Sequence, residues 1–177
     1  MIITAGIYKG RKITAPDEKI TRPTLSKTRM GIFNSLFSIL GDFEGKTFLD
    51  VFGGSGIMGL EALSRGFSSV KVIELNKKSA EIIKKNYGTL NLKPDLIIGD
   101  SIKILEKSEE KFDVIYIDPP YKSNLYDKIL GLTKGNIIVV EHSENIDFSG
   151  FEVLKEKTYS SSKITFLSNF VPKSDNC

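Results

Sequence analysis

The stretch that decides the fold runs from Phe48 to Gly59 and reads FLDVFGGSGIMG. Its first five residues predict a buried strand, and the apolar pattern from Ile57 onward predicts a helix. The loop between them has the spacing Gly54-x-Gly56-x-x-Gly59. Glycines allow positive φ angles and close approach of a ligand to the backbone, and a helix N-terminus favours an anionic group. This arrangement predicts a loop that binds a nucleotide-like cofactor; a tight turn for helix–strand packing is the alternative interpretation.

Outward from this loop, short apolar runs alternate with helical patterns. Such alternation predicts a parallel sheet with helices on both faces. The last two runs have few polar residues between them and predict a closing antiparallel pair. The predicted class is therefore α/β, with a mostly parallel seven-stranded sheet and a C-terminal antiparallel hairpin. Strands are expected at residues 47–52, 70–74, 95–98, 112–117, 136–141, 151–159 and 162–170, and helices at 26–40, 57–65, 78–90, 101–107 and 125–132.

The beginning of the chain is basic. The 177 residues carry a net charge of +3, yet the first 40 contain seven basic and two acidic side chains. Two β-prone runs around Lys9-Gly10 predict a small β-hairpin extension, and the prolines at 16 and 23 exclude a central strand there. We therefore expect a basic arm at residues 1–25 and a single domain at residues 26–177. Clustered basic charge favours a polyanionic partner, although a solvated surface is the alternative for any one lysine.

Rare residue types and hydropathy exclude several classes of protein. Cys177 is the only cysteine and His142 the only histidine, so an intrachain disulfide, a cysteine-rich zinc site and a multi-histidine metal site are excluded. We expect no metal, and we expect His142 to make a local hydrogen bond. No apolar run reaches the roughly 18 residues of a membrane span, and no secretory signal is evident. A cytoplasmic protein without a membrane partner is expected.

Carboxylates at the ends of the first three predicted strands favour one class of cofactor. Glu74 follows Gly54 by 20 residues, the distance at which a carboxylate accepts hydrogen bonds from ribose hydroxyls in Rossmann-like sites. Asp50 would repel the pyrophosphate of a nicotinamide cofactor but can pair with the ammonium group of S-adenosylmethionine. Asp100 can accept a hydrogen bond from an adenine amine, or it can cap the following helix.

The tetrapeptide Asp118-Pro119-Pro120-Tyr121 follows the fourth predicted strand. Each proline restricts its own φ and the conformation of the residue before it, so the loop is stiff. It presents the carboxylate of Asp118 and the carbonyl of Pro119 as two acceptors, beside the ring of Tyr121. These groups suit a planar base with an exocyclic amine. A rigid turn without function is the alternative.

Two acceptors at an exocyclic amine also suit methyl transfer. The nitrogen gains positive charge as the sulfonium loses it, so acceptors nearby stabilise the transition state more than the ground state. In a doubly wound sheet the first and fourth strands meet at the switch point, where a ligand crevice opens. We therefore expect the glycine loop and the Asp118 loop to face each other.

On these motifs the chain resembles the class I S-adenosylmethionine-dependent amino-methyltransferases, which carry an Asp/Asn-Pro-Pro-Tyr/Phe motif. More closely, it resembles the RsmD family of bacterial 16S rRNA guanine-N2 methyltransferases. Ser160 to Lys163 stand where relatives often have a glycine-containing turn. The stretches that carry the resemblance are 2–6, 9–12, 22–24, 27–29, 33–36, 49–66, 73–74, 118–121 and Glu141.

This resemblance implies a function and a set of site residues. The implied reaction moves a methyl group from S-adenosylmethionine to the N2 amine of a guanine in 16S rRNA, within small-subunit assembly particles, by a monomeric enzyme. The implied catalytic residues are Asp118, Pro119, Pro120 and Tyr121. The implied cofactor residues are Asp50, Phe52, Gly54, Ser55, Gly56, Glu74, Leu75, Asp100 and Ser101, and the implied RNA contacts are Lys9, Arg11, Lys12, Arg22, Lys27, Arg29 and Lys122.

Two other functions share part of this pattern. A DNA adenine-N6 or cytosine-N4 amino-methyltransferase would carry both loops, but no additional target-recognition domain is evident, and a small basic arm suits structured RNA better. A non-catalytic nucleotide-binding module would carry only the glycine loop.

Overall fold

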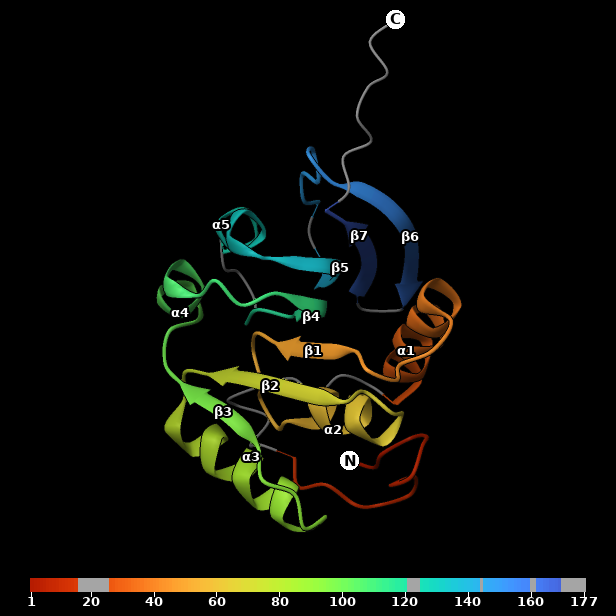
Figure 1. The fold of residues 1–177 in the computed structure, drawn as a ribbon, viewed down its shortest axis with the longest axis vertical. Helices are drawn as coiled ribbons and strands as arrows, with labels where there is room; N and C mark the ends of the chain where they lie inside the picture. Colours follow the sequence, from red (N-terminus) through yellow and green to blue (C-terminus); the bar gives the residue numbers. More distant parts are fainter. Residues whose placement is uncertain (16–25, 121–124, 144, 160–161, 170–177) are drawn as a thin grey trace, which may run out of the picture.

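A computed structural model of the chain describes residues 1–15, 26–120, 125–143, 145–159 and 162–169. Seven strands form one sheet in the order β3-β2-β1-β4-β5-β7-β6 (Figure 1). The first five strands pair in parallel, whereas β7 is antiparallel to both β5 and β6. The predicted α/β class is thus confirmed. The strands are β1 (Thr47–Asp50), β2 (Ser69–Glu74), β3 (Asp95–Ile98), β4 (Phe112–Ile117), β5 (Gly135–His142), β6 (Glu152–Tyr159) and β7 (Ser162–Ser168).

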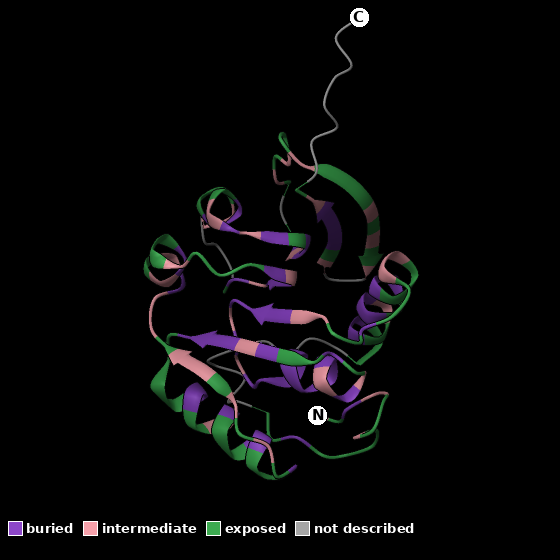
Figure 2. Ribbon diagram, viewed as in Figure 1, coloured by how far each residue is buried: buried purple, intermediate pink, exposed green. Residues whose placement is uncertain are grey.

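Helices cover both faces of this sheet. They are α1 (Ser26–Leu40), α2 (Ile57–Ser64), α3 (Lys77–Gly88), α4 (Ser101–Lys107) and α5 (Tyr126–Leu132). One buried cluster packs α1, α2 and α3 against one face, and a second packs α4 and α5 against the other. Along β4, Val114 belongs to the first cluster and Ile115 to the second, because successive side chains of a strand point to opposite faces. In Figure 2 much of the central strands is purple, because consecutive residues there are buried.

The neighbouring strands β1 and β4 form the switch point of the sheet. Asp50 is the register partner of Tyr116, and the Val51 amide donates to the Tyr116 carbonyl at 3.1 Å. To one side of this pair the chain continues through β2 and β3, and to the other side through β5. The loops that follow β1 and β4 therefore leave the same edge of the sheet, as the sequence predicts.

The N-terminal segment forms the predicted hairpin, although without long strands: the Ile3 amide donates to the Arg11 carbonyl at 3.1 Å and the Ile13 amide to the Met1 carbonyl at 2.8 Å. Residues 1–15 contain a single antiparallel bridge, Ile2 to Lys12, and no regular strand. Regular strands do not extend toward the tip, because there the Thr4 amide donates to the carboxylate of Glu61 and the Ile7 amide to the Ser64 carbonyl, both in α2. The segment therefore pairs with itself and also satisfies the last turn of α2. The predicted boundary at residues 25 and 26 adjoins segment 16–25, outside the described residues.

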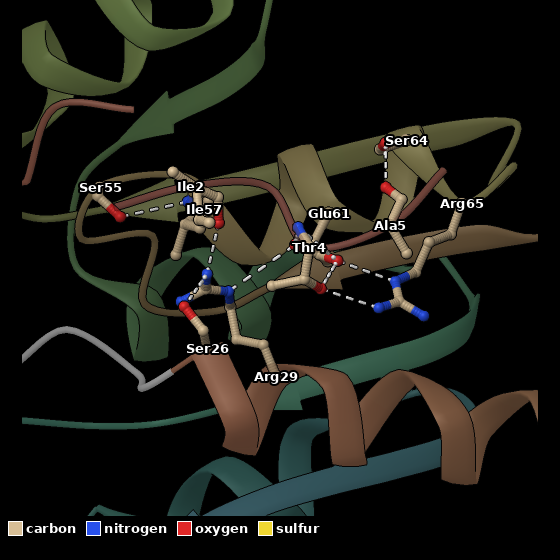
Figure 3. Close-up of polar contacts among 10 residues, drawn as sticks. All are labelled: Ile2, Thr4, Ala5, Ser26, Arg29, Ser55, Ile57, Glu61, Ser64 and Arg65. Carbon is tan, nitrogen blue, oxygen red and sulfur yellow. Dashed lines mark hydrogen bonds and ion pairs between the residues drawn. The ribbon is translucent and has the colours of Figure 1, made fainter. Parts of the chain in front are cut away.

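A buried cluster of charged side chains holds this segment to the helices (Figure 3). Glu61 of α2 is completely buried and accepts hydrogen bonds from Thr4 and from Arg65 Nε, the latter at 3.0 Å. Arg29 of α1 lies 3.8 Å from the same carboxylate, and its guanidinium donates to the Ile2 carbonyl at 2.7 Å. Two cations around one carboxylate compensate its burial.

Two further observations bear on the predicted exclusions. Within the part of the chain that the structure describes, no helix is both long and apolar enough to cross a membrane. The same residues contain no group of three or more histidine, cysteine, aspartate or glutamate side chains arranged to hold a metal. His142 is buried and its Nε2 lies 2.9 Å from Thr165 Oγ1, which confirms the predicted local hydrogen bond.

Candidate active site

The glycine loop has the backbone conformation that its sequence predicts. Gly54 and Gly56 have φ angles of 55° and 77°, in the left-handed region that favours glycine. Gly53 is required for a steric reason, because an added Cβ would lie 2.4 Å from Val72 Cγ1 of β2. The loop thus packs directly on the neighbouring strand and enters α2 at Gly56.

Glu74 supports one side of this loop. Its Oε2 accepts a hydrogen bond from the Gly54 amide at 2.7 Å, and its Oε1 accepts one from the Asn76 amide at 2.7 Å. The side chain is therefore oriented by two backbone groups, at the carboxyl end of β2 where the sequence places it. Each carboxylate oxygen can accept more than one hydrogen bond, so this orientation is compatible with ribose hydroxyls as further donors.

Asp50 is the least satisfied polar group of the site. Its side chain is buried, and neither carboxylate oxygen has a hydrogen-bond partner among the described residues. Burial raises the pKa of Asp50 to about 7, and the nearby charge of Glu74 contributes to the rise. The Phe52 amide lies close enough to the carboxylate to oppose this rise, but it does not reach normal hydrogen-bond geometry. A buried carboxylate without a partner costs free energy unless a donor or a cation completes it. The Asp50 carboxylate is therefore positioned to accept a cationic group.

Asn86 holds the other side of the loop, and the sequence analysis missed it. This fully buried residue of α3 donates from Nδ2 to the Ser55 carbonyl at 2.8 Å. The same amide pairs with the backbone of Thr14, accepting from its N–H at 2.9 Å and donating to its carbonyl at 3.0 Å. A polar residue on the apolar face of a predicted helix is the signal that could have identified it.

The remaining predicted cofactor residues surround the same edge. Asp100 caps α4, accepting from the Lys103 amide at 3.1 Å through Oδ1, as the alternative interpretation expects, and it lines an open hollow of about 500 Å³. Ser101 is buried and donates to the Val51 carbonyl at 2.8 Å. Phe52 is half-buried, whereas Leu75 is 66 % exposed.

The Asp118 loop begins two residues beyond the register partner of Asp50. Asp118 is half-buried, Pro119 buried and Pro120 exposed. In β4, which precedes this loop, the hydroxyl of Tyr116 donates to Glu141 Oε2 of β5 at 2.6 Å. Tyr121 and Lys122 lie outside the described residues. The structure therefore brings the first three residues of the predicted tetrapeptide to the edge that carries the glycine loop.

The predicted RNA contacts divide into three groups. Lys9, Arg11, Lys12 and Lys27 are exposed, and Arg22 lies outside the described residues. Arg29 is a correction, because its side chain is fully buried against Glu61 and the Ile2 carbonyl. Burial also lowers the pKa of Arg29, and the carboxylate of Glu61 opposes that effect. A phosphate cannot reach this guanidinium in the folded chain, so Arg29 stabilises the junction of the arm with α1 and α2.

The donor and acceptor set fits a cofactor with a cationic end and a hydroxyl-bearing ring. Asp50 offers an unpartnered buried carboxylate, and the glycines leave space along the backbone. A pyrophosphate does not fit equally well, because Asp50 and Glu74 would repel it. The strand order and these loops define the class of the domain, a Rossmann-like methyltransferase fold of class I.

Comparison with known proteins gives the family. The chain belongs to the family described as Conserved hypothetical protein 95, which matches residues 1–168. Ribosomal RNA small subunit methyltransferase D of Haemophilus influenzae is 33% identical over 171 residues, covering 88% of this chain and 87% of that protein. The protein of the same name from Escherichia coli is 30% identical over 135 residues, covering 76% of this chain and 67% of its own length.

Solved structures agree with this assignment. A methylase of Haemophilus influenzae superposes with a TM-score of 0.75 at 30% identity, covering 96% of this chain and 98% of that one. A methyltransferase solved in complex with SAH has a TM-score of 0.62 at 17% identity, covering 79% of this chain and 49% of that one, and it bears on the fold alone.

Proposed function

We propose that the chain is an S-adenosylmethionine-dependent methyltransferase of ribosomal RNA, and that its target is the N2 amine of a guanine in 16S rRNA. The observation that carries the proposal is the pairing of β1 with β4, which puts the unpartnered carboxylate of Asp50 and the Asp118 loop at one edge of the sheet. The relatives named ribosomal RNA small subunit methyltransferase D support the ribosomal substrate.

The residues of the site have separate roles in the proposed reaction. Asp50 binds the ammonium group of the methyl donor, Glu74 its ribose hydroxyls, and Asp100 its adenine amine. The bound donor supplies an electrophilic methyl group on a sulfonium. The carboxylate of Asp118 and the carbonyl of Pro119 accept the two hydrogens of the guanine amine and orient the nitrogen lone pair. The nitrogen would gain the methyl group as the sulfur–methyl bond breaks, S-adenosylhomocysteine would leave as the neutral thioether, and one proton of the amine would pass to solvent.

The proposed catalysis depends on orientation and electrostatics more than on a strong base. Correct alignment of two bound reactants can contribute about 7–11 kcal/mol to the barrier reduction. The acceptors on Asp118 and Pro119 strengthen as the nitrogen becomes positive, so they favour the transition state. Proposed contacts of Lys9, Arg11, Lys12 and Lys27 with phosphates position the RNA without reading its sequence.

The test is methylation in vitro of three substrates prepared without this modification: naked 16S rRNA, small-subunit particles and DNA of matched sequence. Mass spectrometry of the digested nucleosides identifies the methylated base. We expect N2-methylguanosine from an RNA substrate, and the comparison of naked RNA with particles identifies the physiological form. Methylation of adenine or cytosine in the DNA, without methylation of RNA, would overturn the proposal in favour of the DNA alternative.

A variant separates the catalytic loop from the cofactor site. Asp118→Ala is expected to abolish methylation while the dissociation constant for S-adenosylhomocysteine, measured by calorimetry, stays within about twofold. Asp42→Ala serves as the control, because Asp42 is an exposed carboxylate paired with Lys46 away from this edge. Retained turnover in Asp118→Ala would refute the role assigned to this carboxylate.

A further inference from the structure

Helix α3 carries a second group of basic side chains that the sequence analysis did not assign. Residues 1–15 and 77–93 together contain eight basic side chains and one acidic side chain, in a chain whose total net charge is +3. All eight are exposed. They are Lys9, Arg11, Lys12, Lys77, Lys78, Lys84, Lys85 and Lys93.

The arm and α3 form one continuous surface. The Arg11 guanidinium donates to the Thr89 carbonyl at the end of α3, at 2.8 Å. The side-chain amide of Asn86 accepts from the Thr14 N–H at 2.9 Å and donates to the Thr14 carbonyl at 3.0 Å. Figure 1 shows the N-terminal segment and α3 at the same end of the molecule. Because these contacts tie the two elements together, their positive charges act as one field.

Helical geometry selects which lysines face the arm. At about 100° per residue, Lys85 and Lys78 lie roughly 100° and 80° from Asn86 around the helix axis. Lys77 and Lys84 lie on the opposite flank, roughly 180° and 160° from Asn86. Lys78 and Lys85 therefore line the flank of α3 that adjoins the arm.

The charges on this flank are unneutralised. Lys84 pairs with Glu81 at 2.8 Å, whereas no ion pair within the described residues involves Lys78, Lys85, Lys9 or Arg11. The position of Lys78 is also unfavourable for the helix itself. It lies in the first turn of α3, which has no acidic residue, and the helix dipole disfavours a cation there. Local rules are most often broken where function requires it.

We propose that the arm and the Lys78–Lys85 flank of α3 form one phosphate-binding surface, which holds the RNA strand beside the target nucleotide. This inference rests on the proposed function, because it takes RNA as the substrate. The surface reaches the active-site edge, since α3 begins directly after Glu74 and Asn86 contacts both Thr14 and the carbonyl of Ser55 in the glycine loop. It contacts the sugar–phosphate backbone, so it contributes affinity without base specificity.

The test compares a double variant with a matched control. Lys78→Gln with Lys85→Gln removes two positive charges from the proposed surface, and glutamine has a helix propensity close to that of lysine. Lys46→Gln with Lys111→Gln removes the same charge at the opposite edge of the sheet, directly before β1 and β4. RNA affinity is measured by fluorescence anisotropy between 0.05 and 0.5 M salt, with an unmodified 16S rRNA fragment as the probe.

Loss of two single-strand phosphate contacts should reduce the slope of log K against log salt by about 1.4 and weaken binding about 25-fold at 0.1 M salt. The control double variant should keep the wild-type slope and affinity. In the Lys78/Lys85 variant kcat/KM should fall while kcat at saturating RNA and the affinity for S-adenosylhomocysteine stay unchanged. The melting temperature should stay nearly unchanged, because removing the cation of Lys78 from the positive end of α3 is offset by removing the cation of Lys85 from its negative end.

Different outcomes separate this inference from the function on which it rests. If the wild-type protein methylates RNA and both double variants bind it alike, the α3 surface is refuted and the proposed function stands. If the wild-type protein neither binds nor methylates the RNA, the proposed function fails. If S-adenosylhomocysteine affinity falls in parallel with RNA affinity, the lysines act through the cofactor site, and the phosphate-binding assignment is overturned.

Discussion

Asp50→Asn should stabilise the unliganded protein at high pH while weakening cofactor binding. The carboxylate is buried without a hydrogen-bond partner, and its pKa is raised from 3.8 to about 7, chiefly by burial. Because the folded state binds this proton more tightly than the unfolded state, stability is lost as the pH rises between these two values. Below both values the carboxyl is protonated in either state, and above both the full cost is present.

The size of this effect follows from the pKa values. At 1.36 kcal/mol per pH unit, a rise from 3.8 to about 7 corresponds to about 4 kcal/mol of stability lost by pH 8. Asparagine cannot ionise, so it removes this loss. The buried amide carries its own cost of about 1–3 kcal/mol, which does not change with pH. The expected signal is therefore a difference: the gain of the variant over wild type should be about 4 kcal/mol larger at pH 8 than at pH 4.

Urea denaturation at several pH values, followed by circular dichroism, measures this difference. Asp42→Asn is the control, because it makes the same carboxylate-to-amide change at an exposed position. Titration of S-adenosylmethionine into wild-type protein should show affinity that rises with pH through about 7, since the ionised carboxylate binds the ammonium group. In buffers of different ionisation enthalpy, binding near pH 7 should release a fraction of a proton. An equal gain for Asp50→Asn at pH 4 and pH 8 would refute the reasoning.

Three further predictions concern the supports of the site. Asn86→Ala removes three hydrogen bonds and should lower the free energy of unfolding by about 3 kcal/mol and weaken S-adenosylhomocysteine binding, whereas Thr14→Ala should do neither, because Asn86 contacts only the Thr14 backbone. Glu61→Ala leaves the buried Arg29 without its counterion and should cost about 3–5 kcal/mol in urea denaturation. Gly59→Ala places a Cβ 2.4 Å from the Tyr87 hydroxyl and should lower the free energy of unfolding by about 1–3 kcal/mol. In Gly88→Ala the added Cβ meets nothing within 4 Å, so this variant should be neutral or more stable by up to about 1 kcal/mol. Thermal melts distinguish the two variants.

The order of the helices and strands could be predicted because it depends on local patterns. Continuous apolar runs such as Ile137 to Val140 indicate strands buried on both faces, and the structure divides their side chains between the two clusters. The antiparallel end of the sheet was also predictable from a local feature, because few residues separate the last two strand-like runs. The N-terminal hairpin contains only one regular bridge because its backbone N–H groups at Thr4 and Ile7 find acceptors in α2, which no local pattern reports.

The sequence by itself determined the chemistry that the site can carry. Positive φ at Gly54 and Gly56 and the stiff Asp118-Pro119-Pro120 step are properties of a few adjacent residues, so their type and spacing are enough to predict them. The position of Glu74 at the end of a strand is also predicted locally, by the strand-like run at residues 70–73.

Only the tertiary structure decided which charges are exposed and which are buried. Arg29 and Lys27 are two residues apart, yet one lies against Glu61 in the interior and the other in solvent. Asp50 acquires its raised pKa from packing around β1, and Asn86 reaches Thr14 across 72 residues of sequence. Burial and desolvation are properties of segments brought together by folding, and they set the energy of a charge more strongly than its neighbours in the chain do.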